Sequence, residues 1–137
     1  MKLQKIALLA AVLSLVGSSC TFYEDGPIIS VIPKKNRIAN IWEAEEVTKA
    51  NGDDITDNYD SWTWTFTEDG DATIEYTLLI NITIEGEWNL IDEGSIFQLI
   101  TNELLGQNIA VYDILRLTED EFWLVDEDGT EFHLRTK

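Results

Sequence analysis

The sequence predicts an all-β fold in which eight antiparallel strands follow one another up and down and close into a β-barrel. Three observations support this prediction. Apolar and polar residues alternate with a period of two along much of the chain, polar turn residues interrupt the alternation at short intervals, and signals for helices are almost absent. The 45% hydrophobic content is enough to order the chain despite a formal net charge of −17. One barrel domain is therefore expected, over residues 38–137.

The first four strands are predicted at residues 38–48, 61–67, 72–79 and 81–91. The second has the clearest pattern, because Trp62, Trp64 and Phe66 share one face and threonines share the other. A polar loop precedes this strand, and an acidic turn that contains Gly70 follows it. Such a two-faced pattern predicts a sheet that is buried on one side only.

The last four strands are predicted at residues 95–101, 108–118, 122–125 and 130–135. Between the first two of these, Leu104 and Leu105 predict a single helical turn. The alternation slips near Leu115, which predicts a β-bulge. Because short turns join consecutive strands, the sequence favours a closed barrel over the alternative, a β-sandwich, which needs long crossing connections.

The N-terminus has the organisation of a bacterial export signal. Lys2 and Lys5 precede an apolar run over residues 6–16, which is too short to span a bilayer core, and small residues then lead to Cys20. A cysteine at this place resembles a lipoprotein lipobox, in which the thiol takes a lipid and becomes the first mature residue. A plain secretory signal is the alternative, but it leaves the only cysteine of the chain unexplained.

These features divide the chain into a lipoprotein signal peptide (1–19), a tether (20–37) and the barrel domain (38–137). Pro27 and Pro33 interrupt any long strand in the tether. The expected location is the cell envelope of a Gram-negative bacterium, as an outer membrane lipoprotein that faces the periplasm or the cell surface. Attachment to the membrane would then occur through the lipid on Cys20.

The acidic composition restricts the partners that the protein can have. Loss of residues 1–19 would remove Lys2 and Lys5 and leave 7 basic against 26 acidic residues. This balance argues against nucleic-acid binding, which depends on lysine and arginine contacts to phosphates. It is consistent with solubility through mutual repulsion, and a weak calcium site is the alternative.

Residues 38–136 resemble the small lipocalin-like domains of Gram-negative lipoproteins. The segments that carry this resemblance are Trp42 on the first strand, the aromatic strand and acidic turn of residues 64–70, residues 86–88, and the closing hairpin of residues 112–124. The resemblance implies an up-and-down barrel. It implies no ligand and no catalytic residue, because the family shares an architecture rather than an activity.

The tryptophans are the leading candidates for a ligand site. The inward-facing aromatic residues on strands one, two and four could line a cavity and stack on a sugar ring or an apolar molecule; they are Trp42, Trp62, Trp64, Phe66 and Trp88. The alternative is that they fill the barrel, since the interior of eight strands is narrow enough for side chains to fill. Trp123 alternates with two apolar neighbours and is expected on the outer face.

Metal, cofactor and catalytic sites are not predicted. Asp53, Asp54, Asp57 and Asp60 could hold a weak calcium ion, but a solvated acidic loop is the default interpretation. His133 is the only histidine, is expected to face solvent, and lacks the further ligands that zinc requires. With Cys20 used by the anchor, no nucleophilic arrangement is available.

Two hypotheses for function follow from these patterns. The first is a lipid-anchored binding or accessory module that holds a small apolar molecule or a glycan. The second is an interaction protein with a filled core, an inhibitor or assembly subunit, which acts through its loops. An enzyme is not expected, and the sequence does not determine the ligand or the oligomeric state.

Overall fold

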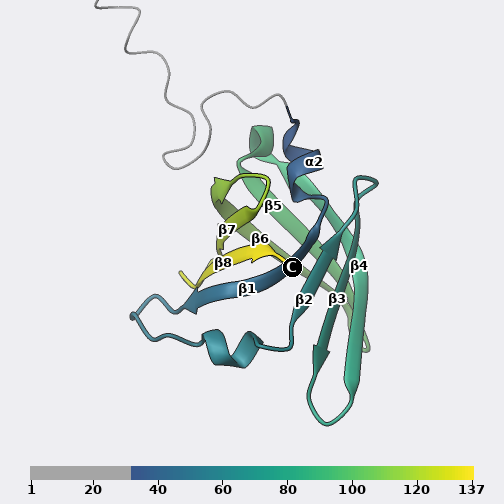
Figure 1. The fold of residues 1–137 in the computed structure, drawn as a ribbon. Helices are drawn as coiled ribbons and strands as arrows, with labels where there is room; N and C mark the ends of the chain where they lie inside the picture. Colours follow the sequence, from purple (N-terminus) through teal and green to yellow (C-terminus); the bar gives the residue numbers. More distant parts are fainter. Residues whose placement is uncertain (1–31) are drawn as a thin grey trace, which may run out of the picture.

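Eight antiparallel strands close into a barrel in the computed structural model, which describes residues 32–137 (Figure 1). The strands are β1 (Ile41–Thr48), β2 (Thr63–Phe66), β3 (Asp71–Thr77), β4 (Asn81–Ile91), β5 (Ile96–Glu103), β6 (Gly106–Leu117), β7 (Glu121–Val125) and β8 (Glu131–Thr136). Each strand pairs with its neighbours in the chain, and β8 pairs with β1 to complete the barrel. The predicted up-and-down barrel is confirmed, and the β-sandwich is excluded.

The predicted strand boundaries differ from the structure mainly at turns. The predicted β-bulge is confirmed, because the register of β6 against β7 shifts between Ile114 and Arg116. The helical turn predicted at Leu104 and Leu105 is wrong. These residues form the tip of the β5–β6 hairpin, since Glu103 pairs with Gly106, and this glycine takes the φ of 129° that a side chain would disfavour.

A short helix, α2 (Lys34–Ile38), begins inside the segment predicted as a tether and packs on the barrel. Its Arg37 and Ile38 are buried. The Arg37 guanidinium Nη1 donates a hydrogen bond of 2.8 Å to the carbonyl of Leu117 at the end of β6. The folded body therefore starts before residue 38. Residues 1–31, which include the predicted signal peptide and Cys20, lie outside the described residues.

The two ends of the barrel differ. We call the end that carries α2 the plugged end; it also contains the turns at residues 67–70, 92–95 and 118–120, the second of which includes the 3-10 helix η2 (Asp92–Gly94). We call the other end the mouth; it is formed by residues 49–62, 78–80, 104–105 and 126–130, the first of which include the 3-10 helix η1 (Thr56–Tyr59). Figure 1 shows α2 and the β3–β4 hairpin at opposite ends.

The plugged end contains the most completely buried part of the core. Trp42 has no exposed surface, and its ring packs against Phe122 with 5.6 Å between centroids. The indole N–H of Trp42 donates a hydrogen bond of 2.8 Å to the carbonyl of Ile38, the last residue of α2. Because a buried indole N–H needs an acceptor, this contact fixes α2 across the barrel.

Trp123 lies on the outer face, as the alternation along β7 predicts. It is half-buried because His133 stacks on its ring at 4.0 Å between centroids and Arg116 lies 5.1 Å from the ring centroid. His133 itself lies near the carboxylates of Glu46 and Glu131, at 3.8 and 3.2 Å. The outer wall is thus covered here by the stacked rings of Trp123 and His133 and by the charged side chains beside them.

Candidate functional site

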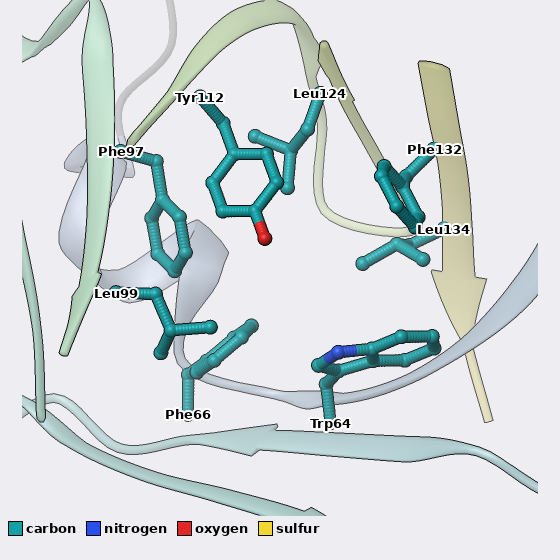
Figure 2. Close-up of a pocket in the computed structure, with 8 residues that line it drawn as sticks. All are labelled: Trp64, Phe66, Phe97, Leu99, Tyr112, Leu124, Phe132 and Leu134. Carbon is teal, nitrogen blue, oxygen red and sulfur yellow. The ribbon is translucent and has the colours of Figure 1, made fainter. Parts of the chain in front are cut away.

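The barrel interior contains a small cavity beneath the mouth (Figure 2). Its volume is about 30 Å³, which is room for one or two water molecules and much less than a typical ligand pocket. Inward-facing side chains of five strands form its walls: Trp64, Phe66, Phe97, Leu99, Tyr112, Leu124, Phe132 and Leu134. The barrel is therefore largely filled by its own side chains, and a larger ligand requires some of them to move.

Two polar groups face this otherwise apolar cavity. Figure 2 shows the hydroxyl of Tyr112 directed into the space between the surrounding side chains, with the indole nitrogen of Trp64 on the ring edge that faces it. Neither group forms a hydrogen bond to another residue of the range 32–137. Neither atom is among the completely buried ones that lack a partner, so water can reach both, and both have hydrogen-bonding capacity left for a guest molecule.

Burial and a negative neighbour keep Tyr112 protonated. Loss of hydration on burial, together with the charge of Asp126, raises the pKa of Tyr112 to about 12. The same two causes raise the pKa of Tyr59. Asp126 is held at the start of the β7–β8 turn, where its carboxylate accepts hydrogen bonds from the backbone N–H groups of Asp128 and Thr130. The cavity therefore offers a neutral phenol in a negative potential.

This environment predicts how stability changes with pH. Tyr112→Phe is expected to leave the stability of the barrel nearly unchanged at pH 7, because it removes a partly buried hydroxyl that forms no hydrogen bond to residues 32–137. The pKa of Tyr112 is higher in the folded state than its ordinary value of 10.0. The wild type is therefore expected to lose roughly 2 kcal/mol through this group as the pH rises from 7 to 11.5, most of it above pH 10.

Urea unfolding at pH 7, 10 and 11.5 measures this difference. Tyr76→Phe is the matched control, because Tyr76 stacks on Trp62 and does not line the cavity. An alkaline loss of stability in Tyr112→Phe that equals the loss in the wild type would contradict the assignment.

A second aromatic cluster covers the mouth. Beyond Trp42↔Trp64, β1 and β2 no longer pair, and η1 packs against β1 in the space between them. This places Tyr59 against Trp62, Trp64 and Phe132, at centroid distances of 5.0, 6.1 and 5.5 Å. Tyr59 thus belongs to no strand, and it packs on Trp64 and Phe132, two residues that line the cavity.

The five aromatic residues proposed from the sequence are divided between different parts of the barrel. Trp64 and Phe66 line the cavity, whereas Trp62 lies in the mouth cluster. Trp42 and Trp88 belong to the packed core, where the indole N–H of Trp88 donates to the carbonyl of Thr67 at 2.9 Å. The structure therefore brings two of the five to the cavity.

Sequence reasoning missed most of the cavity wall, including Tyr112, Leu99 and Phe132. The period-two alternation on β5, β6 and β8 was the available signal, because it places these side chains inside. These three strands contain no tryptophan, so they lack the residue type that marks a candidate ligand site most clearly.

The acidic loop is held by local hydrogen bonds. Asp54 accepts a hydrogen bond of 2.9 Å from the backbone N–H of Thr56 and another from its hydroxyl; these bonds lower the pKa of Asp54. Asp53 accepts one from the Asn51 amide at 3.0 Å. Within residues 32–137, no three histidine, cysteine or acidic side chains are grouped so that they could hold a metal ion. No helix of the described part is long and apolar enough to cross a membrane.

Two solved structures share this fold. One is a lipocalin-like protein from Bacteroides uniformis, with a TM-score of 0.61 and 19% identity over 74% of this chain and 99% of that one. The other is a protein from Bacteroides eggerthii, with a TM-score of 0.58 and 15% identity over 72% of this chain and 98% of that one. The sequence matches no protein-family profile and no curated protein. The likeness establishes a lipocalin-like fold.

Proposed function

We propose that this protein is a non-catalytic binding module that takes a small apolar molecule into the mouth end of its barrel. The observation that carries the proposal is the apolar cavity beneath the mouth, with an unpaired phenol directed into it. A concave, mostly apolar site with few polar groups is typical of small-molecule binding. The lipocalin-like fold of the structural neighbours is consistent with this use.

A ligand larger than the present cavity requires an entry route, and movement of Tyr59 would provide one. This residue packs on the cavity wall from η1, which is held to β1 by the hydrogen bonds of Ile55 N–H to the Val47 carbonyl and of Val47 N–H to the Thr56 hydroxyl. Outward movement of η1 would open the cavity without breaking the strand ladder. The ligand would replace the aromatic contacts that Tyr59 loses.

An apolar ligand fits this mouth better than a glycan. Sugar rings stack on exposed aromatic faces, but Tyr76 already stacks on Trp62 at 4.3 Å with 8° between the ring planes. Tyr59 also packs against Trp62, 5.0 Å away. The tryptophan nearest to solvent at the mouth is thus engaged by its own neighbours.

Binding of N-phenyl-1-naphthylamine tests the proposal, because the fluorescence of this uncharged probe rises in apolar surroundings. The wild type is expected to bind it saturably. Leu124→Phe, which fills the cavity, is expected to weaken binding at least tenfold, since the cavity has no spare volume for both. Ile100→Phe is the matched control, because Ile100 lies on the opposite side of its strand from the cavity residue Leu99. No binding to the wild type, or equal binding to both variants, would refute the proposal.

We also propose that the barrel is attached to the bacterial outer membrane through a lipid on Cys20, and that it works in the cell envelope. The proposal is supported by the order of basic, apolar and small residues before the only cysteine. Growth with radiolabelled palmitate is expected to label the wild type and not Cys20→Ser. Globomycin, which blocks cleavage of lipoprotein signals, is expected to cause the precursor to accumulate. Unlabelled wild-type protein would refute the anchor.

A second candidate function, docking to a protein through the mouth, is favoured by two apolar hairpin tips. Leu79, Leu104 and Leu105 are fully exposed, and Leu78 and Ile80 are about 70% exposed. Continuing the β4–β5 register places Leu105 level with Ile82, so the two tips are neighbours. Hairpin turns are normally polar, and clustered exposed apolar residues mark interaction sites.

Charge indicates what such a partner would look like. Among residues 32–137, every lysine and arginine except Lys49 lies on α2 or at the strand ends beside it. The loops of the mouth instead carry carboxylates. A protein surface that is apolar at its centre and basic at its rim would fit.

Site-specific photo-crosslinking in cells tests the docking function. A crosslinker in place of Leu79 is expected to capture one protein at an apolar and basic segment, and a crosslinker in place of Glu119 at the plugged end is not. Equal capture from both positions, or capture of lipid alone, would count against docking.

A further inference from the structure

We infer that the ligand of the barrel is an uncharged molecule with a carbonyl or ether oxygen, held by hydrogen bonds from the Tyr112 hydroxyl and the Trp64 indole N–H. This inference rests on the proposed function, and it specifies the chemical class of the ligand. The two groups face one cavity whose other walls are hydrocarbon. An oxygen acceptor placed between them would satisfy donors that have no partner among the described residues.

The donor character of the two groups determines which functional group fits. An indole N–H donates and cannot accept a hydrogen bond. The Tyr112 phenol remains protonated at physiological pH, since its pKa is raised to about 12 by burial and by Asp126. A protonated amine could donate to the oxygen of Tyr112, but it has no acceptor to offer to the Trp64 N–H. A carbonyl or ether oxygen accepts from both groups.

Charge argues against an anion such as a fatty acid. No lysine or arginine lines the cavity. The carboxylate of Asp126 acts on both phenols and disfavours negative charge at Tyr112 and at Tyr59 alike. A carboxylate ligand would therefore meet repulsion and lose its hydration without gaining a cation.

A matched series of small ligands tests this inference by displacing bound N-phenyl-1-naphthylamine at pH 8. Heptan-2-one carries the carbonyl, and 2-methylhept-1-ene replaces its oxygen by a CH₂ group of similar shape. Heptanoate and heptylammonium carry the two charges. We expect heptan-2-one to displace the probe at concentrations at least tenfold lower than either charged ligand requires.

Variants of the donors make the test specific. Tyr112→Phe is expected to weaken the binding of heptan-2-one by about 3- to 10-fold, the effect of one neutral hydrogen bond, and to leave the binding of 2-methylhept-1-ene unchanged. Trp64→Phe also removes part of the cavity wall, so it is expected to weaken the binding of heptan-2-one relative to that of 2-methylhept-1-ene by a similar factor. Tyr76→Phe removes a phenol hydroxyl at the mouth that does not line the cavity, and it is expected to change the affinity for neither ligand. Circular dichroism verifies that each variant is folded.

The outcomes separate this inference from the function on which it rests. If the probe itself does not bind, the binding function fails. If the probe binds and Tyr112→Phe weakens the binding of the ketone and of the alkene equally, the assigned hydrogen-bond donors are wrong. Tighter displacement by heptanoate or heptylammonium than by heptan-2-one would overturn the uncharged class.

Discussion

Trp42→Ala is expected to lower the free energy of unfolding by roughly 3–5 kcal/mol, which is a large part of the stability of a small domain. Trp42 has no exposed surface and packs against Phe122, so its removal leaves a cavity at the centre of the plugged end. The variant also loses the hydrogen bond from the indole N–H to the Ile38 carbonyl, which holds α2 across the barrel. The loss therefore combines a packing defect with an unpaired carbonyl.

Urea unfolding followed by far-ultraviolet circular dichroism measures this loss without relying on tryptophan fluorescence. Trp123→Ala is the matched control, because Trp123 lies on the outer face and contacts His133 and Arg116. Its expected cost is about 1 kcal/mol, the usual value of an aromatic contact. Equal losses from the two substitutions would contradict the view that burial of Trp42 in the plugged end contributes more to stability than an aromatic contact on the outer face.

Gly86→Ala is expected to destabilise the barrel by roughly 3 kcal/mol or more, although it adds a single methyl group. A Cβ at this position would collide with the backbone carbonyl of Ile100 on β5, and backbone cannot move aside as a flexible side chain can. Gly86 does not have a left-handed φ, so the cost is steric. The collision would disturb the β4–β5 pairing that forms one wall of the barrel.

Gly52→Ala provides a comparison in which the cost comes from backbone conformation and not from a steric collision. Gly52 has a φ of 92°, and a Cβ there would meet no atom within 4 Å. Its expected cost is about 1–2 kcal/mol, from the left-handed backbone alone. Thermal unfolding of both variants measures the two effects, and a Gly86→Ala protein as stable as the wild type would show that the strands approach less closely than described.

The barrel itself was predictable because period-two alternation is a local signal. Trp64 and Phe66 occupy one face of β2 whatever surrounds them, and short turns leave little choice of topology. The position of the bulge near Leu115 was also predictable, since a slip in alternation is visible in the residues themselves.

The plug was not predictable from sequence. Helix α2 has five residues and no side-chain hydrogen bond at its N-terminal cap, so it carries none of the signals that mark a helix start. Its position depends on two hydrogen bonds to the barrel. The indole N–H of Trp42 on β1 donates to the last residue of the helix, and the carbonyl of Leu117 on β6 accepts from Arg37. Similarly, Leu104 and Leu105 resemble a helical turn locally, and only the pairing of Glu103 with Gly106 makes them a hairpin tip.

The candidate site was only partly predictable, because it too depends on contacts between residues that are distant in the sequence. Alternation places Tyr112 inside the barrel, but it does not show whether its hydroxyl has a partner. That depends on Trp64, Leu99 and Phe132, which come from three other strands. A cavity is the space that side chains leave, so it becomes visible only when all of them are in place.

Intermolecular NOEs between bound heptan-2-one and leucine methyl groups test the central claim most directly, because they locate the ligand. The described structure places Leu99, Leu124 and Leu134 around the cavity, and Leu79 and Leu104 on the exposed tips. We predict NOEs to the first three leucines and none to the two tip leucines. NOEs confined to Leu79 and Leu104 would show that the ligand binds outside the barrel and would contradict the account.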